Sequence, residues 1–186
     1  GEYRVTVTGT GNYTDSLVFE LTISKGVLGL TGPASVTYNG TDQKPDKDAL
    51  TVTANGAQLT DYTVRYLDAD GVTEVSEIKD AGIYTIKVSA DNYTSAKMTF
   101  VVLPKELTDA DIESGPSDCV YNGAAQEPTV TMKSDVVDCT FTYASNSDVG
   151  QGSVTITAPA TGNYSGSVTK NFEITAFELT TENTTV

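Results

Sequence analysis

Apolar and polar residues alternate along most of the chain. In residues 3–7 and again in residues 17–23, every second side chain is apolar and most of the intervening ones are polar. A period of two is typical of a β-strand that buries one face. Gly11-Asn12 lies between these segments, so the pattern predicts a β-hairpin. Similar alternating segments flank Asn92 and Asn163, which predicts two further hairpins.

Short phrases recur along the chain in a fixed order. An Asn-Tyr phrase lies between the strands of each predicted hairpin, and a Tyr-Asn-Gly phrase, which we call the head phrase, precedes two of them. The Asn-Tyr phrases contain Tyr13, Tyr93 and Tyr164, and the head phrases begin at Tyr38 and Tyr121. Self-similarity of this kind predicts an array of modules.

The spacing of the phrases predicts two complete modules with a fragment at each end. We expect boundaries near Lys25 and near Pro104, which lacks the N–H needed to continue strand pairing. The predicted parts are the closing hairpin of a truncated preceding module (1–24), two modules (25–104 and 105–175), and the start of a truncated following module or a tail (176–186).

Turn signals divide the predicted strands. Asn55-Gly56 is a strong signal for a two-residue hairpin turn. The segment 68–71, Asp-Ala-Asp-Gly, resembles the start of a Ca²⁺ loop, but the later oxygens do not fall in the register such a loop needs. We therefore interpret it as a turn. Residues 105–112 are compatible with a helical turn, but their frame in the repeat favours a strand.

The charge of the chain argues against two classes of partner. It has 25 acidic and 11 basic residues, a net charge of −14. Nucleic acids and anionic membranes both attract a basic face, so we expect neither as a partner. The acidity indicates solubility, with affinity for Ca²⁺ or cationic partners as the alternative. No apolar run approaches the roughly 18 residues of a membrane span, so no membrane insertion is expected.

The residue types present favour a protein that is not an enzyme. The chain has no His, which excludes Ser-His and Cys-His relays and His-containing metal sites. Pairs of carboxylates exist by number, but none stands out from a solvated face. We therefore expect no catalytic residue, no metal site and no cofactor.

The two cysteines, Cys119 and Cys139, form the most testable pair. Alignment of the modules places Cys119 where Val36 stands and Cys139 where Tyr62 stands, and both share the parity of the buried face. One prediction is a disulfide, which an extracellular setting permits. The alternative is two buried thiols that act as small hydrophobic residues.

The tyrosines allow a ligand-binding and a structural interpretation. Exposed aromatic rings stack on the apolar faces of sugars, but tyrosines that recur at the same turn in every module favour packing over the hairpin end. We interpret the recurring tyrosines as structural residues: Tyr13, Tyr38, Tyr84, Tyr93, Tyr121 and Tyr164.

The segment from Asp80 to Ile86, Asp-Ala-Gly-Ile-Tyr-Thr-Ile, resembles the corner before the penultimate strand of immunoglobulin-like domains. In that corner a Tyr hydroxyl, here that of Tyr84, returns to the backbone. The corresponding segment 148–153 lacks the Tyr.

The order of the phrases resembles a known family. A head phrase is followed by a Pro (Pro45, Pro128), Asp-Tyr-Thr-Val-x-Tyr (61–66), Asp-Ala-Gly-x-Tyr, Asn-Tyr-Thr and Phe-x-Ile. This order is similar to the tandem repeat modules, of the YDG or MBG type, in large bacterial surface proteins. The resemblance implies an extracellular, cell-attached protein built of stacked β modules and often described as adhesin-like.

Pattern and resemblance together predict an all-β chain of tandem immunoglobulin-like β-sandwich modules. A β-grasp-like module, with a helix crossing the sheet, is the alternative. The expected function is that of a non-enzymatic extracellular segment of a bacterial surface protein, either an adhesion module or a stalk or spacer, with an unknown protein or glycan ligand. The alternative function is a glycan-binding accessory module of an extracellular enzyme.

The two end fragments invite self-association, because each leaves an unpaired edge and an apolar face. The second fragment begins with Phe177-Glu178-Leu179-Thr180, which resembles an opening strand. We expect the first hairpin to pack on the start of the first module or on a neighbouring molecule, and to bury Tyr3, Val5, Phe19 and Leu21 there.

Overall fold

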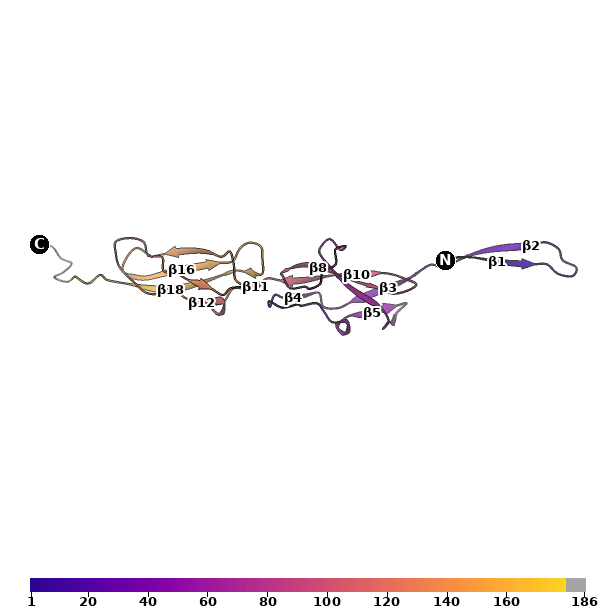
Figure 1. Cartoon of the computed structure of the whole chain (residues 1–186), viewed down its shortest axis with the longest axis horizontal. Helices are drawn as coiled ribbons and strands as arrows, with labels where there is room; N and C mark the ends of the chain where they lie inside the picture. The colour runs from indigo at the N-terminus through magenta and orange to yellow at the C-terminus, as the bar shows by residue number, and fades with distance from the viewer. Residues whose placement is uncertain (180–186) are drawn as a thin grey trace. The chain divides into compact units, whose positions relative to one another are not determined.

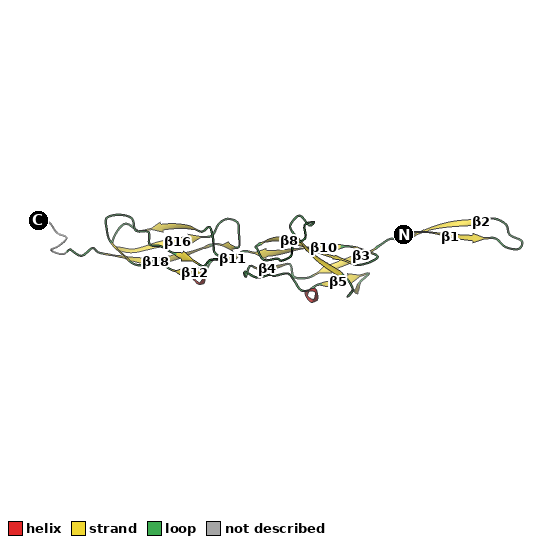
Figure 2. Cartoon of the chain, viewed as in Figure 1, coloured by secondary structure: helices red, strands yellow, loops and turns green. Residues whose placement is uncertain are grey.

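The computed structural model describes residues 1–179 and is all-β, with several sheets, which is consistent with the β-sandwich class (Figure 2). Strands make up 48% and helices 3% of the residues. The helical residues form two short 3-10 helices, η1 (Lys47–Ala49) and η2 (Asp109–Asp111). Among residues 1–179 there is thus no helix to cross a sheet, as a β-grasp-like module requires. No helix in this range is long and apolar enough to cross a membrane.

The chain folds into two compact units. Unit 1 comprises residues 1–34, 44–76 and 84–100, and unit 2 comprises residues 35–43, 77–83 and the chain from residue 101 onward. Residues 177–179 of the predicted opening strand belong to unit 2 and are not in a strand; Thr180 and the rest of the predicted tail lie outside the described residues.

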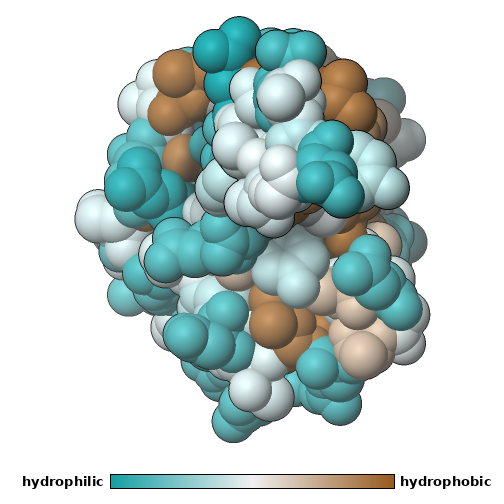
Figure 3. Space-filling model, turned by 90° about the vertical axis from the view of Figure 1, so that its right-hand side faces the viewer, coloured by the Kyte–Doolittle hydropathy of each residue, from teal (hydrophilic) through white to brown (hydrophobic). Residues whose placement is uncertain are grey.

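Unit 1 begins with the predicted hairpin, in which β1 (Glu2–Thr8) pairs with β2 (Ser16–Thr22). Its apolar side chains are all at least half exposed: Tyr3, Val5, Val7, Leu17, Phe19 and Leu21. The prediction that this face packs on the start of the first module is therefore wrong, and the alternative, packing on a neighbouring molecule, stays a prediction. The alternating pattern identified the apolar face correctly, but it carries no information on what covers that face. Figure 3 shows one surface of the molecule on which hydrophobic residues lie among hydrophilic ones.

The core of unit 1 lies on a sheet with the order β6-β5-β3-β9. Its strands are β6 (Ala57–Gln58), β5 (Thr51–Ala54), β3 (Gly26–Thr31) and β9 (Tyr93–Thr94). β3 pairs antiparallel with β5 and parallel with β9. The Asn55-Gly56 turn joins β5 to β6 with both residues at positive φ, as the sequence predicts. Leu28, Val52, Ala54 and Val88 form a buried cluster.

Two four-stranded sheets, some of whose strands are labelled in Figure 1, have corresponding strand orders. One is β4 (Ser35–Thr37), β10 (Ala96–Leu103), β8 (Gly82–Ser89) and β7 (Thr63–Leu67). The other is β13 (Cys119–Val120), β18 (Ser167–Thr175), β16 (Gly150–Thr157) and β15 (Thr140–Ala144). In both, the first pair is parallel and the last pair antiparallel. Of the alternating side chains that lead into Asn92 and Asn163, Ile86, Val88, Val154 and Ile156 are buried, whereas Tyr84 and Ala158 are half-buried.

Unit 2 also contains two short two-stranded sheets. β11 (Lys105–Glu106) pairs parallel with β17 (Tyr164–Ser165), and β12 (Ile112–Ser114) pairs antiparallel with β14 (Thr131–Met132). The single strand predicted over residues 105–112 is therefore wrong, because η2 interrupts it. The side chain of Asp111 turns back to Thr108 and draws this segment into one helical turn.

In the segment 148–153, which lacks the corner tyrosine, an aromatic ring from the neighbouring strand fills the space above the strand. In β16, Gly152 lies directly opposite Phe172 of β18. A Cβ atom on Gly152 would lie 2.6 Å from the Phe172 ring, so only glycine fits. The Phe172 ring thus occupies the space above the strand, and the Tyr143 ring meets it edge to face at 6.4 Å. In β8, Tyr84 is half-buried; its predicted return to the backbone stays a prediction.

Candidate functional site

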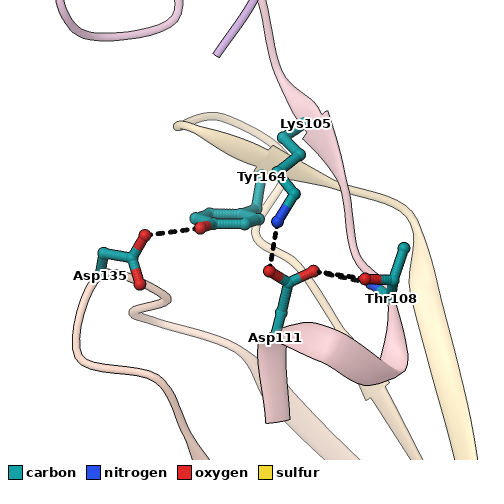
Figure 4. A network of polar contacts seen from close by, with 5 residues as sticks. All are labelled: Lys105, Thr108, Asp111, Asp135 and Tyr164. Atoms are coloured by element: carbon teal, nitrogen blue, oxygen red, sulfur yellow. Dashed lines mark hydrogen bonds and ion pairs between the residues drawn. The ribbon is translucent and has the colours of Figure 1, made fainter. Parts of the chain in front are cut away.

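A network of polar contacts in unit 2 surrounds Tyr164 (Figure 4). Tyr164 is the first residue of β17, opposite Lys105 on β11, and it is 7% exposed. Its hydroxyl donates a hydrogen bond to Asp135 Oδ2 at 2.7 Å. The Lys105 Nζ lies 5.3 Å from the centre of the Tyr164 ring, within the range of a cation–π interaction.

Lys105 also forms an ion pair with Asp111, the one charged residue that is buried among residues 1–179. The other Asp111 oxygen accepts hydrogen bonds from the Thr108 hydroxyl at 2.8 Å and the Thr108 amide at 3.0 Å. Burial alone would raise the pKa of Asp111, but the hydrogen bonds from Lys105 and Thr108 outweigh it and hold the pKa below the ordinary value of 3.8. Asp111 is therefore ionised and fully paired at neutral pH.

The Tyr164 hydroxyl is unsuited to acid–base chemistry near neutrality. Burial, together with the hydrogen bond to Asp135 and its negative charge, raises the pKa of Tyr164 well above its ordinary value of 10.0. A pocket of about 340 Å³ adjoins the network, lined by Tyr38, Asn39, Lys105, Asp111, Lys133, Asp135 and Tyr164. Since Lys105, Asp111, Asp135 and Tyr164 are paired with one another, this arrangement favours a structural role.

Two recurring phrases meet at the Tyr164 ring. Tyr38, which begins the first head phrase, packs against Tyr164 with the ring centres 5.6 Å apart and the planes at 70°. This edge-to-face geometry is favourable for aromatic pairs. Tyr38 is 6% exposed as a result, so the ring of one recurring tyrosine covers another.

Asn163, the neighbour of Tyr164, binds a third phrase. Its side-chain amide donates to Asp80 Oδ1 at 2.9 Å, and its carbonyl oxygen accepts from the Ala81 amide at 2.7 Å. Asp80 and Ala81 begin the Asp-Ala-Gly phrase that the sequence relates to an immunoglobulin-like corner. Asn163 thus makes a two-point contact with a segment about 80 residues away in sequence, and all these residues belong to unit 2.

The remaining recurring tyrosines are less buried. Tyr93 lies on β9 and is half-buried against the core of unit 1. Tyr121, in the second head phrase, is 37% exposed, and Tyr13 in the β1–β2 loop is 78% exposed. The network therefore brings together two of the six predicted tyrosines, Tyr38 and Tyr164.

Cys119 and Cys139 are both free and half-buried, so the predicted disulfide is wrong within one molecule. Cys119 lies on β13 and Cys139 precedes β15, at opposite edges of one four-stranded sheet, about 14 Å apart across the strands. Cys119 is also level with Gly150 at the start of β16, whereas Cys139 lies beyond its end. A disulfide requires Cα atoms within roughly 7 Å. Shared parity placed both residues on the same face, but not near each other.

Two corresponding contacts were not predicted from the sequence. The Tyr66 hydroxyl donates to the carbonyl oxygen of Pro45, and the Tyr143 hydroxyl donates to that of Pro128 at 2.8 Å. Both prolines and Tyr66 belong to the recurring order of phrases. The sequence therefore contained a signal for these contacts, because a Tyr at the corresponding position follows the recurring Pro in both segments.

The Asp-Ala-Asp-Gly segment forms the predicted turn before β8. Asp70 accepts hydrogen bonds from Thr73 and Val72, which lower the pKa of its carboxyl group. These carboxylate oxygens satisfy the loop's own donors. In residues 1–179, no group of three or more His, Cys, Asp or Glu residues is arranged to hold a metal ion.

No protein-family model and no curated protein shows significant similarity to this chain.

Proposed function

We propose that the chain is a non-enzymatic, extracellular repeat segment of a bacterial surface protein, and that it serves as a stalk or spacer. In this proposal, residues 25–104 and 105–175 are immunoglobulin-like β-sandwich modules in tandem. The corresponding orders of the two four-stranded sheets support the repeat. The order of sequence phrases, which resembles YDG or MBG modules, supports the extracellular setting.

The contact between recurring phrases carries the proposal. Tyr38 and Asp80 lie in the first proposed module, and Tyr164 and Asn163 lie in the second. Their contacts consist of two hydrogen bonds and an aromatic pair, all made between residues that recur with the modules. Residues that fasten successive modules to each other suit a spacer, whose task is to keep its modules in line.

An adhesion or glycan-binding role is the second candidate, and a specific observation favours it. Tyr13 is largely exposed and lines a mostly apolar hollow of about 410 Å³ with Val7 and Leu17. Exposed aromatic rings beside apolar surface are suited to stacking on sugars. In this alternative the chain is the glycan-binding accessory module of an extracellular enzyme.

A glycan array tests the spacer proposal against this alternative. We expect the purified chain to bind no glycan on the array above background. Reproducible binding of the chain to a glycan on the array that is lost in Tyr13→Ala would contradict the spacer proposal. Thr10→Ala, in the same loop as Tyr13, is the matched control, because it changes the loop without removing a ring.

A further inference from the structure

Asn163 and Tyr164 contact Tyr38, Asp80 and Ala81. Residues that correspond to these three contacted residues recur later in the chain, and there they are exposed. Tyr121 corresponds to Tyr38: the Tyr38 amide donates to Leu103 O and the Tyr121 amide to Thr175 O, each at 2.8 Å. Tyr38 is covered by Tyr164 and is 6% exposed, whereas Tyr121 is 37% exposed.

The acceptor for Asn163 has a counterpart of the same kind. Asp148-Val149 corresponds to Asp80-Ala81, and both of its residues are exposed. The contact with Ala81 uses the backbone amide, which Val149 also has, so the larger side chain does not remove the donor. A hollow of about 370 Å³ lies over this segment, lined by residues 145–151.

The partner strand of Tyr164 also has an exposed counterpart. In unit 2, the Lys105 amide donates to Asn163 O and the Leu107 amide to Ser165 O, each at 2.9 Å. Counted from the paired residues Leu103 and Thr175, Lys105 corresponds to Phe177 and Leu107 to Leu179. Leu107 is buried, whereas Phe177 and Leu179 are more than half exposed. Tyr121, Asp148-Val149 and Phe177–Leu179 together form what we call the acceptor face.

One turn of the chain has the same geometry as the turn that carries Asn163 and Tyr164. The Gly9 amide donates to Asp15 O at 2.9 Å, as the Ala158 amide donates to Gly166 O at 3.0 Å. Asp15 and Gly166 both have positive φ, 72° and 77°. Asn12-Tyr13 and Asn163-Tyr164 stand at the same distance before these residues. Asn92-Tyr93 lies in a tighter turn, in which Asn92 itself has positive φ.

We propose that the acceptor face binds the Asn12–Asp15 turn of a second copy of this chain. In this contact Asn12 bridges Asp148 and the Val149 amide, Tyr13 packs against Tyr121, and Tyr13–Thr14 pairs in parallel with Phe177–Glu178. The inference rests on the module organisation proposed above. The contact is head to tail, so the two surfaces differ and association is open-ended.

The contact also covers apolar surface that is otherwise exposed on both partners. Tyr13 exposes its ring on one side, and Tyr121, Phe177 and Leu179 expose apolar side chains on the other. Contacts within one chain act at an effective concentration on the order of millimolar. A separate copy lacks this advantage, so a test of the contact between copies has to extend to that range.

A concentration series of ¹H–¹⁵N NMR spectra of the whole chain, up to the millimolar range, tests the proposal. We expect the amide signals of residues 12–15, 121, 148–149 and 177–179 to shift or broaden together as the concentration rises. In Asn12→Ala these changes should disappear, while the remaining spectrum shows that the variant is folded. Asn92→Gly is the matched control, because it removes the same side chain from the tighter turn and keeps the positive φ; it should leave the changes intact.

Several results would overturn the proposal. They are an absence of concentration-dependent changes at the acceptor face, changes that persist in Asn12→Ala, and changes confined to β1 and β2, which would mean that the hairpins pair with each other. The spectra contain no glycan, so they report on docking alone, whereas the glycan array reports on the proposed function.

Discussion

The aromatic pair of Tyr38 and Tyr164 allows a quantitative test of the contact between recurring phrases. We consider Tyr38→Leu, Tyr164→Leu and the double variant. Tyr164→Leu removes a hydrogen bond to a carboxylate that remains in contact with water, which costs about 1 kcal/mol of unfolding free energy. It also removes the edge-to-face pair, worth about 0.5–1.5 kcal/mol. The single variant should therefore lose about 2 kcal/mol before any cost of a cavity.

The double-mutant cycle isolates the part that belongs to the pair. Chemical denaturation followed by tyrosine fluorescence gives the unfolding free energy of each variant. Because the chain has two compact units, the transition that responds to Tyr164→Leu is the one analysed. We expect a coupling energy between Tyr38 and Tyr164 of about 1 kcal/mol.

Tyr121 provides the control for this cycle. It corresponds to Tyr38 but lies beside the last residue of β18, whereas Tyr164 precedes the first, so the two rings are not in contact. The cycle with Tyr121→Leu should be additive within about 0.3–0.5 kcal/mol. If the Tyr38–Tyr164 coupling is no larger than this, or if Tyr121 gives the same coupling, the rings do not stabilise each other and the reasoning is refuted.

Three further predictions concern other parts of the network and the strands. The pKa of Asp111 is lowered on folding, so its contribution to stability is present above pH 3.8 and is lost as the pH falls below that value. In an acid titration, the unfolding free energy of Asp111→Asn should therefore depend less on pH than that of the unmodified chain. An unchanged pH dependence would contradict the pairing of Asp111. Cys119 and Cys139 should both react with an alkylating reagent in unfolded, non-reduced protein, and in the folded protein Cys139 should react more slowly than a free thiol, because burial and Asp138 raise its pKa; mass spectrometry that finds a disulfide would contradict this. Tyr66→Phe and Tyr143→Phe should each cost about 1 kcal/mol in thermal unfolding, since each leaves a proline carbonyl without its donor, and a neutral effect of both would show that these bonds do not stabilise the fold.

The sequence predicted local features well, because local geometry determines them. The Asn55-Gly56 turn follows from the positive φ that only a few residues tolerate, and the burial of Ile86 and Val88 follows from the period of two along a strand. The all-β class follows from the same patterns.

The contacts between distant segments could not be predicted in the same way. Parity put Cys119 and Cys139 on one face, but only the strand order shows that they lie at opposite edges of a sheet. The alternation of residues 1–24 identified an apolar face and could not identify its cover. The recurrence of the Asn-Tyr phrase indicated a structural role for Tyr164, yet nothing in a single sequence pairs Asn163 with Asp80.

Hydrogen exchange at the Ala81 amide tests most directly whether the recurring phrases hold the segment of Asp80 and Ala81 against that of Asn163 and Tyr164. This amide donates to the Asn163 side chain at 2.7 Å, whereas the corresponding Val149 amide lies in an exposed segment. At protein concentrations far below the millimolar range, we expect the Ala81 amide to exchange more slowly than the Val149 amide. Asn163→Ala should remove that protection and leave Val149 unchanged. Equally fast exchange of both amides in the unmodified chain, or protection of Ala81 that survives in Asn163→Ala, would contradict the account.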